Sequence, residues 1–477
     1  MRTTLRLLIF LFLFGCSSPK HHYSIKEINK EIVSGNFTRA TELIDSLVSE
    51  GQLSEAQQQA LLFTQDSLHR VELDFNKTKD EIINWIEKNR LFTPSDSLMD
   101  SWEQSKTLEF RIIDGEKRYF RNAAPNIFRV DASARVLSLA SLPSSDVPHD
   151  ALLTDAFNHK ISSDTKGKYL LPEKSMKVRY TLTVNADAVP DGEILKVWLP
   201  FPRKDIDRQT NVELLATSQP DYILSDDKTA HTSLYMEQKA IEGEPSVFWA
   251  DFQFTSRGEW FDLSEIEVTP YDKNSTLFRT YTAEQKPHIG FSQAVRELTD
   301  SVTRNAETPV EILQAVYRYI AANYPWASAL EYSTIANIPE YVIENRKGDC
   351  GQVALLLITM LRYKGIPARW QSGWMTHPGE VNLHDWAEVY FEGSGWIPVD
   401  ISFGRGEPVP IRPGREFFMS GIDSYRLYIN SDFSGDFYPE KKYPRSETID
   451  FQRGEVESGQ WNLYFDQWRY RMELTYR

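Results

Sequence analysis

The sequence predicts an α+β protein of several domains, in which an N-terminal α-helical region is followed by a β-sandwich and then by an α+β core with a C-terminal β extension. Three observations predict this fold class. The hydrophobic residues change from helical spacing to strict alternation at residue 176, and helical spacing returns near residue 290. The chain has 477 residues, a length at which several domains are expected. Hydrophobic residues make up 41% and aromatic residues 13% of it, which indicates packed globular domains.

The first 15 residues have the features of a signal peptide. Arg2 and Arg6 give a positive start, and the apolar run 7–14 is too short to span a bilayer, which takes about 20 residues. The sequence LFGC at 13–16 resembles the lipobox of bacterial lipoproteins, where the cysteine, here Cys16, is lipidated and becomes the mature N-terminus. The alternative is an ordinary signal peptide with a chance cysteine.

A lipid on Cys16 predicts the location of the protein. The chain would be anchored in the bacterial cell envelope, at the outer membrane, with residues 16–22 as the tether. The segment SSPKHHY at 17–23 carries no acidic cluster of the kind that favours surface export, so we expect the periplasmic side rather than the surface. No second apolar run approaches membrane length, so the lipid is the expected membrane contact.

The charge of the chain argues against one class of partner. Its 53 basic and 68 acidic residues give a net charge of −15. Nucleic-acid binding relies on basic patches, so we expect no nucleic-acid partner.

Residues 23–140 carry the helical pattern. Apolar residues recur at helix spacing from Ile25 onward, and Ser54 is expected to begin a third helix. The segment GNFTRATELIDSLVSEG at 35–51 looks like one helix of a tetratricopeptide-type hairpin, although no second copy follows at a fixed period. A protein partner of this helical domain is a further possibility.

The next two segments are predicted to be a linker and a β-sandwich. Residues 141–169 contain several Ser, Asp and Pro residues, which is typical of a linker. Within 170–285, apolar and polar residues alternate as in half-buried strands, first along 176–184 and again along 248–254. This pattern predicts an antiparallel sandwich, which serves either to support the core or to dock a substrate.

The core, 286–404, has a cysteine at the start of a buried helix. Asp349 is a good N-cap residue, Val353 to Leu361 is almost wholly apolar, and Gly365 can end the helix. Cys350 therefore lies in the first turn, where unpaired N–H groups and the helix dipole favour a thiolate, the nucleophilic form. The alternative is a buried cysteine that acts only as a small hydrophobic side chain.

A nucleophilic cysteine needs a base, and two histidines follow it. His377 lies in a loop, whereas His384 begins the strand HDWAEVYF, which has Asp385, Ala387, Val389 and Phe391 on one face. A second strand, WIPVD, ends at Asp400. A hairpin with a bulge at a glycine would place Asp400 opposite His384, where the carboxylate could orient the imidazole. A surface histidine and a turn aspartate are the alternative.

These residues resemble a known family. Cys350 in RKGDCGQVALLLITMLRYKGIPAR, His384 in HDWAEVYF and Asp400 in GWIPVDISFG are similar to the motifs of the transglutaminase-like superfamily, over residues 290–404. The resemblance implies a papain-like fold, in which the cysteine opens a helix packed on an antiparallel sheet that carries the His and the Asp. It also implies a thioester acyl-enzyme formed from an amide and resolved by water or by an amine. Cys350 would then be the nucleophile, His384 the general base and acid, and Asp400 the orienting residue.

Two further expectations concern the site. An oxyanion needs a donor besides the N–H of the nucleophile, and Trp326 is the nearest upstream indole, although core packing is its alternative role. Gln352 lies after the cysteine and is not assigned. Potential metal ligands are present, but no HExxH or CxxC spacing occurs, so we expect neither a metal nor a cofactor.

The C-terminal segment 405–477 is rich in aromatic residues and is predicted to be an extension that packs on the core. Taken together, the sequence predicts an envelope-anchored thiol enzyme that acts on amide bonds, and that hydrolyses peptides or proteins more readily than it cross-links them. The alternative is a non-catalytic lipoprotein that uses the same domains to bind a protein or a glycan.

Overall fold

The computed structural model describes residues 24–51, 53–139, 148–404 and 416–477. The chain divides into two compact units, one of residues 1–143 with 326–341 and the other of residues 144–325 with 342–477. In the part of the chain that is described, no helix is both long enough and apolar enough to cross a bilayer.

The first unit is helical, as the sequence predicts. Ser54 caps its third helix, where the hydroxyl accepts from the N–H of Gln57. The helices pack through apolar faces that include Ile28, Ile44 and Ile127. The elements are α1 (Ile25–Ser34), α2 (Phe37–Ser49), α3 (Glu55–Asp74), α4 (Lys79–Arg90), α5 (Asp96–Gln104), β1 (Phe110–Ile113), β2 (Glu116–Tyr119), α6 (Ala123–Val130) and α7 (Ala132–Leu137).

The first unit also contains residues 326–341, which the sequence assigns to the core. This segment includes η1 (Tyr332–Thr334) and the start of α12 (Ile338–Asn345). The buried Arg70 holds it: the guanidinium donates to the Ser333 hydroxyl at 3.1 Å and lies 3.7 Å from the Glu331 carboxylate. Asn126 adds a reciprocal pair of hydrogen bonds with the main chain of Ser328. These contacts are distant in sequence, so helix patterning alone did not indicate them.

The second unit contains the predicted β-sandwich. One sheet has the order β13-β9-β4-β17 with β3 and β6 beside it, and the other has the order β16-β15-β5-β8-β7. The inward residues of the long strands, such as Val178, Leu182 and Phe252, are fully buried between the sheets. The strands are β3 (Ile161–Ser162), β4 (Lys168–Val184), β5 (Ile194–Pro200), β6 (Gln209–Thr217), β7 (Ile223–Leu224), β8 (Ser233–Lys239), β9 (Ser246–Phe261), β13 (Gly421–Ile422), β15 (Glu455–Glu457), β16 (Asn462–Leu463) and β17 (Trp468–Tyr476).

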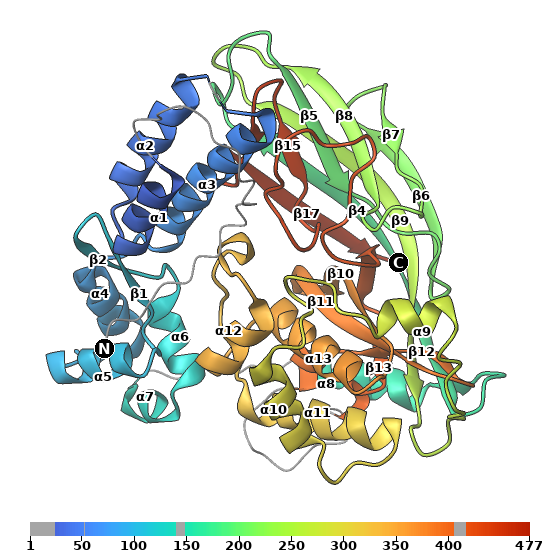
Figure 1. The fold of residues 1–477 in the computed structure, drawn as a ribbon. Coiled ribbons are helices and arrows are strands. Elements are labelled where there is room, and N and C mark those ends of the chain that lie inside the picture. The colour runs from blue at the N-terminus through green and yellow to red at the C-terminus, as the bar shows by residue number, and fades with distance from the viewer. Residues whose placement is uncertain (1–23, 52, 140–147, 405–415) are drawn as a thin grey trace. The chain divides into compact units, whose positions relative to one another are not determined.

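Two boundary predictions differ from the structure. The C-terminal segment does not simply pack on the core: β17 pairs with β4 from Trp468–Val184 to Tyr476–Met176, and β15 pairs with β5 (Figure 1). The predicted linker contains α8 (Pro148–Asn158), whose Leu153 and Ala156 pack in one cluster with Leu171 and Phe417. In both cases apolar side chains complete a core built from distant parts of the chain.

The core of the second unit is a four-stranded sheet covered by helices. The sheet order is β12-β11-β10-β14, and α13 packs against β10 and β11 (Figure 1). Trp374 and Leu427 from this sheet share the hydrophobic core of the sandwich, so the two layers form one continuous core. The elements are α9 (Thr276–Tyr281), α10 (Gln293–Val302), α11 (Pro309–Asn323), α13 (Cys350–Tyr363), β10 (Ala368–His377), β11 (Glu380–Phe391), β12 (Gly395–Val399), α14 (Ile401–Gly404) and β14 (Arg426–Asn430).

Candidate functional site

Cys350 is the first residue of α13, as the sequence predicts. Asp349 caps the helix by accepting from the N–H of Gln352 at 3.0 Å, and the Gln352 side chain accepts in return from the N–H of Asp349 at 3.3 Å. Residues 351–362 of the helix are all buried. The apolar helix therefore anchors the cysteine rigidly, while the capping box defines where the helix starts.

The thiol of Cys350 faces a carboxyl group that was not predicted. Its Sγ lies 3.2 Å from Oδ2 of Asp385 on β11. The other oxygen of Asp385 accepts from the side-chain amide of Gln452 at 2.7 Å, and the same amide donates to the carbonyl of His384 at 2.9 Å. Gln452 comes from the segment between β14 and β15, so three distant parts of the chain meet around Asp385.

This environment opposes formation of a thiolate, contrary to the expectation from the helix N-terminus. Burial raises the pKa of the Cys350 thiol well above its ordinary value, and the carboxylates of Asp385 and Asp349 raise it further. Burial also raises the pKa of Asp385 well above its usual range, with Asp450 and Asp349 adding to the shift. The helix dipole is outweighed because the thiol is partly buried and the carboxyl groups of Asp385 and Asp349 lie beside it.

His384 and Asp400 lie together in the structure. Nε2 of His384 is 2.7 Å from Oδ2 of Asp400, and both side chains are buried. The expected bulge is wrong: β11 and β12 pair from Ala387–Val399 to Phe391–Gly395 without a shift in register. Asp400 is the first residue after β12, so it reaches His384 diagonally across the hairpin rather than from directly opposite.

A buried network that the sequence did not indicate surrounds this pair. Arg426 on β14 donates to Asp400 Oδ2 at 3.2 Å and to Asp423 Oδ1 at 3.2 Å. His377 lies 3.2 Å from Asp423 through its Nε2. The sequence did hold one sign of this network: Arg426 lies in the apolar strand RLYIN, and a buried arginine needs an acidic partner.

The network fixes the protonation of the carboxyl groups. Burial opposes ionisation of Asp400, but contacts with His384 and Arg426 outweigh it and hold its pKa below the usual range. Asp423 follows the same pattern, since Arg426 and His377 overcome the effect of burial and lower its pKa. Burial lowers the pKa of His384, and Asp400 partly offsets this effect. The arrangement favours a neutral imidazole beside an ionised Asp400, which suits a general base.

Cys350 and His384 are not in contact in this structure. In the ladder with β10, His384 pairs with Gly373 and Asp385 pairs with Ser372. Successive side chains of a strand leave opposite faces, so the thiol meets Asp385 on the face that α13 covers. Within the described structure no hydrogen bond joins Cys350 to His384. Because Asp400 occupies Nε2, Nδ1 is the ring nitrogen that remains to take a proton from a thiol.

The remaining predicted site residues fall elsewhere. Trp326 belongs to the first unit, is 41% exposed, and has the guanidinium of Arg129 4.6 Å from its ring centre. Gln352 has a buried Nε2 with no hydrogen-bond partner in the described structure, and this is the polar group that the sequence left unassigned beside the cysteine. Cys16 lies outside the described residues. Among those residues, no group of three or more His, Cys, Asp or Glu side chains is arranged to hold a metal ion.

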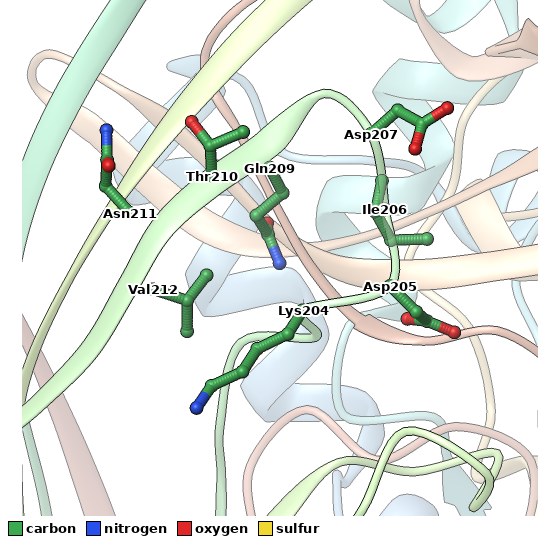
Figure 2. A pocket seen from close by; sticks show the side chains of 8 residues that line it. All are labelled: Lys204, Asp205, Ile206, Asp207, Gln209, Thr210, Asn211 and Val212. Carbon is green, nitrogen blue, oxygen red and sulfur yellow. The ribbon is translucent and has the colours of Figure 1, made fainter.

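Two pockets of the second unit lie away from these residues. One, of about 510 Å³, is lined by residues 204–207 before β6 and residues 209–212 at its start, with Lys204 and Asp207 among its polar groups (Figure 2). The other, of about 580 Å³, is lined in part by Phe157, Trp260 and Phe417. None of the predicted site residues lines either pocket.

Comparisons with known proteins agree with the motif. Residues 296–401 match the model of the transglutaminase-like superfamily. An uncharacterised protein of Bacillus subtilis (strain 168), YebA, is 23% identical over 177 residues, which is 33% of this chain and 24% of that protein, so the match spans about a quarter of the relative's length.

Solved structures also show a likeness. A candidate cysteine protease from Cytophaga hutchinsonii has a TM-score of 0.43 and 14% identity, covering 65% of this chain and 92% of its own. The periplasmic domain of TgpA from Pseudomonas aeruginosa has a TM-score of 0.27 and 17% identity, and the match covers 65% of this chain and 87% of the TgpA domain. Together with the cysteine at the start of α13 and the His–Asp pair on the sheet, the family match identifies residues 296–401 as a domain of the transglutaminase-like superfamily.

Proposed function

We propose that this protein is a thiol enzyme that acts on amide bonds through Cys350, His384 and Asp400. The observation that carries the proposal is the buried His384–Asp400 pair at 2.7 Å, held by Arg426 and located in the strand next to the helix that Cys350 opens. A buried histidine whose carboxylate partner is kept ionised by an arginine is the arrangement expected of a general base. The match to the superfamily supports the same assignment.

The proposed reaction begins with proton transfer from the thiol to Nδ1 of His384. The Cys350 sulfur then attacks the carbonyl carbon of the amide, which forms the C–S bond and places negative charge on the carbonyl oxygen. The proposed donors to this oxyanion are backbone N–H groups at the start of α13. His384 returns the proton to the leaving amine as the C–N bond breaks, and a thioester remains.

The second half of the reaction releases the acyl group. A water molecule gives its proton to His384 and attacks the thioester carbonyl, and the sulfur leaves and regains a proton as the carboxylic acid forms. Asp400 orients the imidazole and stabilises its charged form in both halves. An amine in place of water would instead give a new amide.

We favour hydrolysis over amine transfer. The hairpin that leads to His384 carries Pro378 and Gly379 at its turn, and residues 379, 380 and 382 are exposed, so it lacks the character of an apolar lid. Amine transfer needs a site that binds the amine and excludes water, because water is otherwise present in large excess. The proposed substrates are peptides or proteins of the cell envelope, where a lipid on Cys16 would anchor the chain on the periplasmic side.

Mass spectrometry with a labelled primary amine tests the proposal. Full chain carrying Cys16→Ser is incubated with a peptide library that includes glutamine-containing peptides, with Cys350→Ala as the matched control. We expect cleaved or deamidated products that depend on Cys350. Dominant amine incorporation would make the protein a transglutaminase, and the same products from Cys350→Ala would refute the proposed nucleophile.

One observation favours the second candidate, a non-catalytic binding protein. The thiol faces Asp385 rather than His384, and its raised pKa makes it a weak nucleophile as the structure stands. An activity-based thiol probe separates the two functions. Failure of Cys350 to react with every electrophilic acyl donor, together with stable binding of an envelope protein or glycan, would support the binding function.

A further inference from the structure

We propose that Asp385 is a positioning residue that holds the Cys350 thiol in a resting state, so that the sulfur must leave Asp385 before it can transfer its proton to His384. This inference rests on the proposed function, since it concerns the same nucleophile. It assigns a role to a residue outside the Cys–His–Asp set, and it explains why the thiol contacts Asp385 and not His384 in this structure.

The first step is the geometry of the contact. The thiol donates to Oδ2 of Asp385 at 3.2 Å, so the only proton of the sulfur is used in this hydrogen bond. Asp385 and His384 are adjacent on β11, so their side chains leave opposite faces of the strand. In this structure the thiol therefore donates to the carboxyl group on the face of β11 that α13 covers, and it must move before it can reach His384.

The second step is that Asp385 is itself held in place. The Gln452 side-chain amide donates to both Asp385 Oδ1 and the His384 carbonyl, so it spans the two residues. The backbone N–H of Gln452 donates to Glu447 at 2.6 Å, and Glu447 pairs with Arg453 at 2.6 Å. The segment between β14 and β15 therefore fixes the Asp385 carboxyl group beside the sulfur. The position of this side chain is thus set by its hydrogen bonds, unlike that of an exposed aspartate.

The third step is the charge that surrounds the pair. From α13, Asp349 faces the site, and from the segment between β14 and β15 come Asp450 and Glu447, with Arg453 and Arg445 as the cations near Asp450. Of these groups, the carboxyl groups of Asp385 and Asp349 act directly on the sulfur. Loss of a proton from the thiol or from Asp385 would place a negative charge beside the other group and beside Asp349, so both protons are retained while the site is at rest.

Alkylation of Cys350 by iodoacetamide as a function of pH tests the role of Asp385. The full chain carrying Cys16→Ser has Cys350 as its sole thiol, because the sequence contains two cysteines. We expect the midpoint of the rate to lie above the value of about 8.5 that is usual for a free cysteine. Asp385→Asn should lower the midpoint by at least about one pH unit, which is roughly a tenfold faster reaction at pH 7.5. Asp432→Asn, a half-buried carboxyl group elsewhere in the unit, is the matched control and should leave the midpoint unchanged.

A second variant keeps the test decisive if Asp385→Asn fails to fold. Asp385→Ala removes the acceptor without adding a donor, and it should shift the midpoint in the same direction. Circular dichroism of each variant checks the fold. An unchanged or raised midpoint in the folded Asp385 variants would overturn the proposal.

His384 supplies the remaining readout. In the parent chain, His384→Ala should hardly change the alkylation rate, because the thiol faces Asp385. In the Asp385→Ala background, His384→Ala should slow alkylation severalfold, because the released thiol can then pair with the imidazole. Equal effects in the two backgrounds would contradict the resting state. Alkylation needs no substrate, so a shift in midpoint without any turnover would refute the proposed function alone, and turnover without a shift would refute the role of Asp385 alone.

Discussion

His384 and Asp385 are neighbours in sequence but lie in opposite electrostatic environments. His384 is held by Asp400, whose charge is balanced by the buried Arg426. Asp385 instead shares its surroundings with Asp349, Asp450 and Glu447. His384 can therefore accept a proton, whereas Asp385 tends to keep its own. The protonation state of the site depends on which of the two residues the thiol contacts.

Substitution of the two histidines should separate the proposed base from its neighbour. His384→Ala should lower turnover by about a thousandfold or more, since the base is lost. It should also cost on the order of 2 kcal/mol of unfolding free energy, because Asp400 loses a buried partner. His377→Ala should reduce activity less, since that ring contacts Asp423 rather than Asp400. Steady-state kinetics and thermal unfolding of both variants measure this, and a larger kinetic loss from His377→Ala would show that the wrong histidine is assigned.

Asp450 should make stability depend on pH. Burial and the neighbouring Glu447 raise its pKa to about 8, far above the value of the unfolded chain. The folded protein then holds a proton that the unfolded chain has released, so the contribution of this group to stability is largest below about pH 4 and is lost as the pH rises toward 8. Asp450→Asn should therefore be about as stable as the parent chain near pH 4 and more stable near pH 8. Urea unfolding at both pH values checks this, and a stability difference that is the same at both would rule out the raised pKa.

At the scale of elements, α13 combines two opposing effects at its first turn. The capping box of Asp349 and Gln352 stabilises the helix start, while the helix N-terminus favours negative charge at Cys350. The carboxylate that caps the helix also raises the pKa of the thiol. Asp349 thus stabilises the start of the helix and at the same time disfavours the thiolate form of Cys350.

Two substitutions of Asp349 separate these effects. Asp349→Ser keeps a capping oxygen without the charge, so it should retain the stability of the chain and lower the pKa of the thiol. Asp349→Ala removes both the capping oxygen and the charge, and it should cost about 1 kcal/mol of unfolding free energy. Thermal unfolding together with the pH dependence of alkylation measures the two effects. An alkylation midpoint in Asp349→Ser equal to that of the parent chain would show that the cap does not influence the sulfur.

At the scale of the molecule, distant segments of the chain are interleaved. The second unit starts near residue 144 and is completed only by β17, whose nine residues pair with β4 at the end of the chain. Trp374 of β10 lies in the same core as the sandwich, and its ring stacks against that of Tyr180 of β4 with the ring centres 5.3 Å apart. The sandwich therefore supports the sheet that carries His384.

Deletion of β17 should therefore inactivate the site without touching it. A chain that ends at residue 467 loses the β17–β4 ladder and the buried Trp468, and it leaves the edge of β4 exposed. We expect a large loss of stability in the second unit and loss of any Cys350-dependent turnover. Trp468→Ala is the milder companion, expected to cost about 3–5 kcal/mol. A truncated chain with the thermal unfolding midpoint of the full chain would show that the strand is dispensable.

The sequence by itself determined the features that depend on a few neighbouring residues. These include the helices of the first unit, the start of α13 at Cys350, the alternating strands of the sandwich, and the motif residues of the transglutaminase-like domain. It also assigned Asp385, Ala387 and Val389 to one face of β11. Caps and hydrophobic periods leave a readable pattern because their partners lie within about four residues, or alternate along one strand.

Only the tertiary structure decided which side chains meet at the site. The contact between Cys350 and Asp385 spans 35 residues, and that between Asp400 and Arg426 spans 26. The helix start alone predicted a reactive thiolate, but the pKa of a buried group depends on charges brought near it by packing, and these came from Asp385, Asp349 and the segment before β15. The same reason explains why the sequence did not predict that β15 and β17 join the sandwich sheets, since no local pattern in a strand indicates which strand it will pair with.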